Sequence, residues 1–227
     1  MKQSNTGQRG SVLVADDHSL YRTGLRFLLK DRLGFDDIIE AGSFDEALDR
    51  LADTKSIELA LFDMSMPGVG GPASLSIVRE TYPNVRVAVV SASEDRDNVL
   101  AAIATGLAGY VPKSLPDDEI VTALRGILDG RIYIPSFMVV KPAVTAQSLA
   151  VPAAIEVSGS KSETIAPSPA RDVTPRQKDV LNCVRRGLSN KEIARELDMA
   201  EGTVKIHLAA LFANFGVRNR TELATKT

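Results

Sequence analysis

The stretch SVLVADDH, residues 11–18, decides the fold, because five small or aliphatic residues are followed at once by two aspartates. Its first five residues are typical of a strand buried in a sheet. A second stretch, IELALF at residues 57–62, has the same character and is followed by Asp63. Each stretch therefore predicts a buried strand with a carboxylate at its carboxyl end.

Short apolar runs alternate with stretches of helical spacing from residue 11 to residue 128. The predicted strands are 11–15, 38–39, 57–62, 85–90 and 109–111. The predicted helices are 20–33, 44–51, 72–82, 95–104 and 117–128, and the first has Leu20, Leu25, Leu28, Leu29 and Leu33 at helical spacing. Strands that alternate with helices form a parallel sheet covered on both faces. The expected fold class is α/β, with a five-stranded parallel sheet.

This pattern is lost between about Pro135 and Asp172, where Pro, Ala, Ser and Val dominate. Such composition is typical of an extended linker, and the stretch is too long for a connection inside one domain. The 227 residues therefore divide into two domains. We expect the first domain at 10–131, the linker at 132–172 and the second domain at 173–227.

The second domain is expected to be entirely helical. The run TPRQ, residues 174–177, and the run SNKE, residues 189–192, each match a capping box that starts a helix. A turn at about Asp198 to Glu201 leads to a third helix, which continues through about Phe215 and stops at Gly216. Two helices joined by a tight turn within a small helical set form a helix-turn-helix.

Charge is distributed unevenly along the chain, although the net charge is only −2. Residues 1–131 hold 14 Lys and Arg against 20 Asp and Glu, whereas residues 171–227 hold 11 against 7. An acidic front half and a basic back half indicate different partners. No apolar run approaches the roughly 18 residues that span a bilayer, and residues 1–10 lack the apolar core of a signal peptide.

The single cysteine, Cys183, falls in an apolar helical pattern and is expected to be a packed core thiol. Disulfide bonds are therefore not expected. Together with the absence of a signal peptide or a membrane-spanning run, this favours a cytoplasmic location and no membrane partner.

Polar residues fall at the carboxyl ends of the predicted strands: Asp16, Asp17, Asp63, Ser91 and Lys113. These ends share one edge of a parallel sheet, so the side chains should meet there. Three carboxylates repel one another and call for a divalent cation, and oxygen ligands suit Mg²⁺. A carboxylate beside Mg²⁺ can attack a phosphoryl donor, while a lysine neutralises the transferring group. Solvated loop charges are the alternative, but all five residues fall at suitable strand ends.

Four motifs make the front half resemble the receiver domain of bacterial response regulators: VADDH at 14–18, FDMSMPG at 62–68, VSA at 90–92 and GYVPK at 109–113. The resemblance covers about residues 10–130 and implies a flavodoxin-like receiver with Asp63 as the phosphoacceptor. It implies that Asp17 and Asp63 ligate Mg²⁺ directly, that Asp16 acts mainly through water, and that the Ser65 carbonyl completes the protein ligands.

The same resemblance implies roles for four further residues. Ser91 would donate a hydrogen bond to the phosphoryl group and Lys113 would pair with it. Ala92 is small and leaves room, and Tyr110 would change rotamer when Ser91 moves. The phosphohistidine belongs to the partner, a sensor histidine kinase, so His18 is expected to have a structural or tuning role.

The back half resembles the DNA-binding domain of the NarL/FixJ regulators, which is a LuxR-type helix-turn-helix. The matching runs are TPRQ at 174–177, GLSNKEIA at 187–194, GTVKIHL at 202–208 and GVRNRTEL at 216–223. The resemblance implies that residues 190–197 form the scaffold helix. The helix after Glu201 would enter the major groove of double-stranded DNA.

Six residues are expected at this DNA interface. Asn190, Lys191 and Thr203 would contact phosphates, and Lys205 and Ile206 would face bases or backbone. His207 is expected to be a packing or phosphate residue, and no partner ligands support a metal role. The apolar residues at helical spacing in the same helix are assigned to the core: Val204, Leu208 and Leu211.

Two departures from the family pattern weaken the predicted DNA binding. Ala200 stands where relatives often place Ser or Thr as a helix cap, and losing that cap costs about 1 kcal/mol. Residues 209–215, with the sequence AALFANF, lack the Lys or Arg that many relatives carry. Binding by one subunit should therefore be weak, which makes dimerisation on paired half-sites more important.

The resulting hypothesis is a transcription regulator of a two-component phosphorelay that is not an enzyme toward outside substrates. A sensor histidine kinase would phosphorylate Asp63, and this would switch homodimerisation and DNA binding. One alternative is a phospho-switched protein-interaction regulator, in which the apolar run 209–215 binds a protein. The other is a Mg²⁺-dependent phosphatase of the haloacid dehalogenase type, which would need a carboxylate where Ser65 stands.

Overall fold

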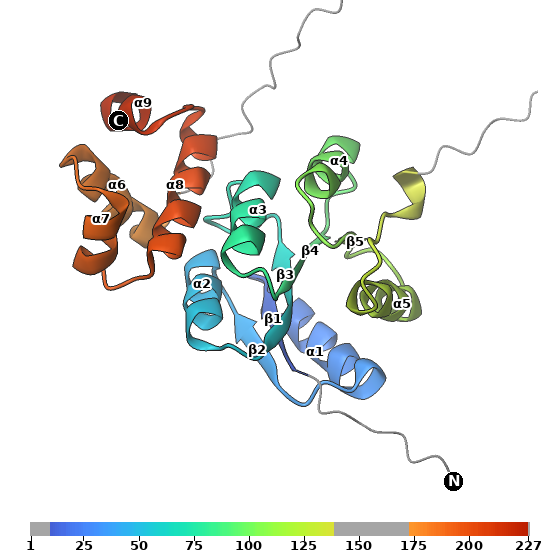
Figure 1. Ribbon diagram of the computed structural model, residues 1–227. Coiled ribbons are helices and arrows are strands. Elements are labelled where there is room, and N and C mark those ends of the chain that lie inside the picture. The colour runs from blue at the N-terminus through green and yellow to red at the C-terminus, as the bar shows by residue number, and fades with distance from the viewer. Residues whose placement is uncertain (1–9, 139–172, 227) are drawn as a thin grey trace, which may run out of the picture.

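The computed structural model describes residues 10–138 and 173–226. Five strands form one parallel sheet in the order β2-β1-β3-β4-β5. They are β1 (Ser11–Ala15), β2 (Ile38–Ala41), β3 (Ile57–Asp63), β4 (Arg86–Ser91) and β5 (Tyr110–Pro112). They alternate with α1 (Ser19–Leu33), α2 (Phe44–Asp53), α3 (Pro72–Thr81), α4 (Arg96–Ala104) and α5 (Asp117–Leu128) (Figure 1). The predicted α/β fold class is confirmed.

Both faces of the sheet are covered, because successive residues of a strand point to opposite sides. Leu13 and Phe62 pack with α2, α3 and α4, while Val12 and Leu61 pack with α1 and α5. The ring of Phe62 meets Phe44 edge to face, with centroids 5.9 Å apart. The carboxyl ends of the strands are thereby left as the edge where polar side chains can gather.

The inward face of α1 differs from the predicted one at its first turn. Leu20 was expected on the buried face, but it is 85% exposed. Tyr21 lies four residues before the buried Leu25, whereas Leu20 lies five before it. A helix aligns residues four apart, so Tyr21 turns inward and Leu20 faces outward.

Residues 132–138, which were expected to begin the linker, lie against the first domain. The backbone of Tyr133 donates to the carbonyl of Ala108 and accepts from the amide of Tyr110, both at 3.1 Å. A short 3-10 helix, η1 (Ser136–Met138), follows. Arg96 of α4 donates to the carbonyls of Phe137 and Met138, both at 3.3 Å. The rest of the predicted linker, 139–172, lies outside the described residues.

The second domain is all helical, as predicted, with α6 (Pro175–Arg185), α7 (Asn190–Glu196), α8 (Glu201–Phe215) and α9 (Arg220–Lys226). Both predicted capping boxes are present, at Thr174 with Gln177 and at Ser189 with Glu192. Ala200 provides no side-chain cap for α8, which ends at Gly216 with φ of 58°. The predicted core residues are buried: Cys183, Val204, Leu208 and Leu211.

The two domains pack together through α8, which lies beside α3 (Figure 1). Ile206 of α8 belongs to the same apolar cluster as Leu75 and Val78 of α3. The side-chain amide of Gln177 donates to the carbonyl of Gly68 at 2.8 Å, in a buried position. The backbones also approach closely, since a Cβ added at Gly70 would lie 2.6 Å from the Cα of Ala210.

None of the described helices is long and apolar enough to cross a membrane.

We expect Gly70→Val to separate the two domains without unfolding either. The φ of Gly70 lies outside the left-handed region, so valine adds no backbone strain there. Its side chain would meet the backbone of α8, which cannot move aside within the closed arrangement. Small-angle X-ray scattering should give a larger radius of gyration for this variant than for the unmodified chain.

Gly24→Ala is the matched control, because a Cβ added there on α1 has no neighbour within 4 Å. This control should scatter like the unmodified chain. An unchanged radius of gyration in Gly70→Val would contradict the closed packing of α8 on α3.

Candidate phosphorylation site and nucleic-acid interface

The carboxyl edge of the sheet brings the predicted acidic residues and Lys113 together. Asp16 follows β1 and Asp63 ends β3, and the two are only 2% and 1% exposed. The ammonium of Lys113, which follows β5, lies 2.6 Å from Asp16 Oδ2 and 2.9 Å from Asp63 Oδ2. Parallel topology explains the meeting, because the three strands end at one edge.

Asp17 completes a carboxylate cluster that fits a divalent cation. One ligand atom from each of Asp16, Asp17, His18 and Asp63 lies within 4.8 Å of all the others. Asp17 is 37% exposed, so the cluster opens to solvent on that side. Three carboxylates and the Lys113 ammonium leave a formal charge of −2, and hard oxygen donors of this kind suit Mg²⁺.

The loop after β3 is tied to the phosphoacceptor candidate. The backbone N–H of Ser65 donates to Asp63 Oδ1 at 3.0 Å. His18 lies on the other side, with Nδ1 2.9 Å from Asp17 Oδ1 and 4.0 Å from Asp63 Oδ2. The role of the Ser65 carbonyl as a metal ligand stays a prediction.

Lys113 keeps its positive charge in this partly buried position. Burial alone would lower the pKa of its ammonium, but hydrogen bonds with Asp16 and Asp63 outweigh that effect and raise the pKa above its ordinary value. Lys113 therefore brings a fixed positive charge to the carboxylates at neutral pH.

Ser91 and Tyr110 meet at a residue that sequence reasoning missed. Ser91 is buried, and its hydroxyl accepts from the backbone N–H of Ser93 at 3.1 Å. The hydroxyl of the fully buried Tyr110 donates to the carbonyl of Ser93 at 2.7 Å. Burial raises the pKa of Tyr110, so its hydroxyl stays neutral. No sequence motif marks Ser93, because its backbone N–H and carbonyl make both hydrogen bonds.

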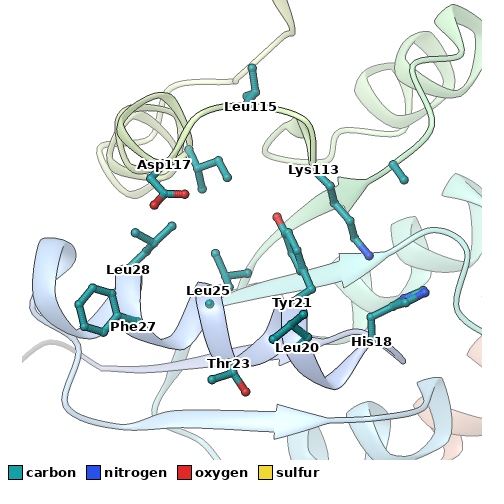
Figure 2. Close-up of a pocket in the computed structure, with 13 residues that line it drawn as sticks. His18, Leu20, Tyr21, Thr23, Leu25, Phe27, Leu28, Lys113, Leu115 and Asp117 are labelled. Carbon is teal, nitrogen blue, oxygen red and sulfur yellow. The ribbon is translucent and has the colours of Figure 1, made fainter.

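A groove of about 890 Å³ runs from this site between α1 and the segment after β5 (Figure 2). His18, Tyr21, Ala92 and Lys113 line it beside the carboxylates. Ala92 is exposed there, in keeping with its predicted role of leaving space. Tyr21 is a second residue that sequence reasoning missed, because its position on the inward face became clear only from the helix phase.

The six predicted DNA-contact residues divide into exposed and buried groups. Lys191 and Lys205 are exposed, and Lys205 lies 3.8 Å from Glu201 of its own helix. Asn190 is partly exposed, and its side-chain oxygen accepts from Arg220 at 3.0 Å. The remaining three are almost fully buried: Thr203, Ile206 and His207.

His207 is buried at the contact between α8 and the first domain. Its Nδ1 lies 3.7 Å from Asp45 Oδ1 of α2, and neither atom has a hydrogen-bond partner within the described residues. Burial, with a smaller contribution from Arg176, lowers the pKa of His207 to about 4, while Asp49 opposes this shift. Burial also raises the pKa of Asp45. The closed arrangement therefore holds His207 in its neutral form.

Two protein families match the chain, one for each domain. The family described as "Response regulator receiver domain" matches residues 12–125. The family described as "Bacterial regulatory proteins, luxR family" matches residues 172–227. Together they match most of the first described part of the chain and all of the second.

Curated relatives match across both domains. The "Glycerol metabolism activator" of Pseudomonas putida is 32% identical over 93% of this chain and 91% of its own length. The "Nitrate/nitrite response regulator protein NarL" of Escherichia coli strain K12 is 30% identical over 94% and 93%.

Solved structures agree with this result. A LuxR family DNA-binding response regulator from Silicibacter pomeroyi is 29% identical with a TM-score of 0.50, over 56% of this chain and 98% of that one. The response regulator RcsB in complex with DNA is 18% identical with a TM-score of 0.52 over 96% and 97%, and supports the fold alone. The chain therefore belongs to the NarL/FixJ family of response regulators, transcription regulators that join a receiver domain to a LuxR-type DNA-binding domain.

Proposed function

We propose that phosphorylation of Asp63 controls whether helix α8 can reach DNA. The observation that carries this proposal is the burial of Thr203, Ile206 and His207, which are predicted DNA contacts, beneath the receiver domain. A helix cannot pack on α3 and enter a major groove with the same residues. DNA binding by this surface therefore requires the domains to separate.

Phosphoryl transfer would use the residues at the sheet edge. A carboxylate oxygen of Asp63 attacks the phosphorus of the kinase phosphohistidine, the P–N bond breaks, and its electron pair leaves with the imidazole. Asp16, Asp17, Asp63 and the Ser65 carbonyl would hold Mg²⁺. The bound ion would neutralise charge on the transferring group. The chain acts on itself in this step, so we class it as a non-enzyme.

Lys113 and the β4 end would stabilise the product. The ammonium of Lys113 already lies 2.9 Å from Asp63 Oδ2 and would pair with a phosphoryl oxygen. Ser91 would move to donate its hydroxyl to another phosphoryl oxygen, and this movement would break the hydrogen bond that its oxygen now accepts from the N–H of Ser93. Tyr110 is bonded to the same residue, which supports its proposed change of rotamer.

The loop from Asp63 to α3 links the phosphorylation site to α8. Gly68 of this loop accepts the hydrogen bond from Gln177, and Gly70 lies against Ala210. A shift of the loop on phosphorylation would therefore act directly on the domain contact. We propose that released domains form a homodimer on paired DNA half-sites. A cytoplasmic location belongs to the same proposal, because the chain must reach DNA.

The apolar run 209–215 receives a structural explanation that weakens the protein-interaction alternative. Ala210 and Leu211 are buried, the first against Gly70 and the second in the core of its own domain. This packing supports the view that residues 209–215 of α8 lack basic side chains because part of this run is covered. The phosphatase alternative gains no support, since Ser65 provides no second carboxylate.

Asp63→Ala should abolish phosphorylation by acetyl phosphate in the presence of Mg²⁺, because the nucleophile is gone. Intact mass spectrometry would measure the phosphorylated fraction, and circular dichroism would check the fold. Asp53→Ala, at the exposed end of α2, is the control and should be phosphorylated like the unmodified chain. A stable acyl phosphate on Asp63→Ala would disprove the assignment.

Mg²⁺ should raise the unfolding temperature of the chain, because it binds the folded carboxylate cluster. At ten times its dissociation constant the added stability is about 1.4 kcal/mol, which corresponds to about 3 °C or more. Differential scanning calorimetry with and without Mg²⁺ measures the shift. Asp17→Asn removes an exposed ligand and should abolish it; a full shift in that variant would argue against this metal site.

Acidification should favour the open arrangement. The closed state depresses the pKa of His207 to about 4, so the stability it gives the contact is present above about pH 6.5 and is lost as the pH falls toward 4. His207 alone would raise the open population roughly tenfold from pH 7.5 to 5.5. Asp45, with its raised pKa, acts in the opposite direction and reduces this effect.

The affinity of the unphosphorylated chain for sheared genomic DNA reports that population. Gly70→Val is the matched control, because its domains should be open at both pH values. The unmodified chain should gain more affinity on acidification than this variant gains. Equal gains would show that His207 does not stabilise the closed contact.

A further inference from the structure

The aromatic ring of Tyr21 lies against the lysine of the phosphorylation site. The Nζ of Lys113 is 4.7 Å from the centroid of this ring, within the roughly 6 Å range of a cation–π contact. Tyr21 belongs to the first turn of α1, whereas Lys113 follows β5. Figure 2 shows the two side chains next to each other at the end of the groove that holds His18.

The ring of Tyr21 and the carboxylates of Asp16 and Asp63 all lie around the ammonium of Lys113. The side chain of Lys113 is only 13% exposed; its ammonium donates a hydrogen bond to Asp63 and forms an ion pair with Asp16. A lysine stem has several rotatable bonds, so its ammonium stays in one place only where neighbouring groups restrict it. The ring of Tyr21 restricts it sterically and adds an attraction between the ring face and the positive charge.

We propose that Tyr21 is a positioning residue that holds the Lys113 ammonium toward Asp63 during phosphoryl transfer. The inference rests on the proposed function, in which Asp63 accepts the phosphoryl group. Tyr21 acts through Lys113 and needs no contact with the donor. Without the ring, Lys113 would reach the transferring group from a wider range of positions, and its stabilisation of the developing charge would weaken.

The ring face, and not the hydroxyl, is the group that acts. The Tyr21 hydroxyl is buried and has no hydrogen-bond partner within residues 10–138 and 173–226. Burial and the nearby carboxylates raise the pKa of Tyr21, so the ring stays neutral and keeps its ordinary attraction for a cation. Phenylalanine should therefore replace Tyr21, whereas leucine fills the space without providing a ring face.

The test compares Tyr21→Phe and Tyr21→Leu in the full chain, with acetyl phosphate and Mg²⁺. Tyr21→Leu should lower the rate constant at saturating donor by about three- to tenfold, with an unchanged half-saturating concentration. Tyr21→Phe should stay within about twofold of the unmodified chain. In a Lys113→Ala background, Tyr21→Leu should cause no further loss, because its effect passes through Lys113.

A second readout needs neither metal nor donor. The ring current should move the ε-methylene protons of Lys113 upfield in the unmodified chain and in Tyr21→Phe, relative to Tyr21→Leu. Tyr21→Met serves in place of Tyr21→Leu if thermal unfolding shows that leucine destabilises the domain.

Four results would overturn the inference. They are an unchanged rate in Tyr21→Leu, an equal loss in Tyr21→Phe, the same loss in the Lys113→Ala background, or a change confined to the half-saturating concentration. A failure of the proposed function looks different, because the unmodified chain would then not be phosphorylated at Asp63 at all.

Discussion

Repulsion between carboxylates at one edge of a parallel sheet is the constraint on which the structure depends. The order β2-β1-β3-β4-β5 places the ends of β1 and β3 side by side, so Asp16 and Asp63 are buried together. Such charges are tolerated only when they are balanced. Lys113 supplies one balancing charge from β5, and a divalent cation would supply the rest. The site is thus charged and compact, as the proposed phosphoryl transfer requires.

The loop that leaves this site also makes the contact with the DNA-binding domain. A few residues after Asp63, the carbonyl of Gly68 accepts a hydrogen bond from Gln177, and Gly70 packs against α8. Gln177 caps α6 with the same side chain, so the start of the second domain and its docking share one residue. The face of α8 that packs on the receiver domain likewise includes predicted DNA contacts, namely Thr203, Ile206 and His207. Under the proposed function, this double use makes the closed and the DNA-bound arrangements mutually exclusive.

Much of the fold and the site could be predicted from the sequence, because strand ends and capping boxes are local signals. Asp16, Asp63 and Lys113 meet as their strand positions require, and Thr174 and Ser189 begin helices through side chains a few residues apart. Other features depend on distant contacts and gave no local signal. Ile206 is predicted from the sequence to face DNA, and only the structure shows that it packs against α3. Gly70 is a single residue, yet its lack of a side chain allows the two domains to approach closely.

The most direct test of the central claim is binding to sheared genomic DNA with and without beryllofluoride and Mg²⁺, for the unmodified chain and for Gly70→Val. If phosphorylation acts by uncovering α8, the unmodified chain should bind discrete sites strongly only with the phosphoryl mimic, whereas Gly70→Val should gain binding without it. If the unmodified chain binds equally in both states, or if Gly70→Val binds no better than it without the mimic, covering of α8 by the receiver domain does not control DNA binding.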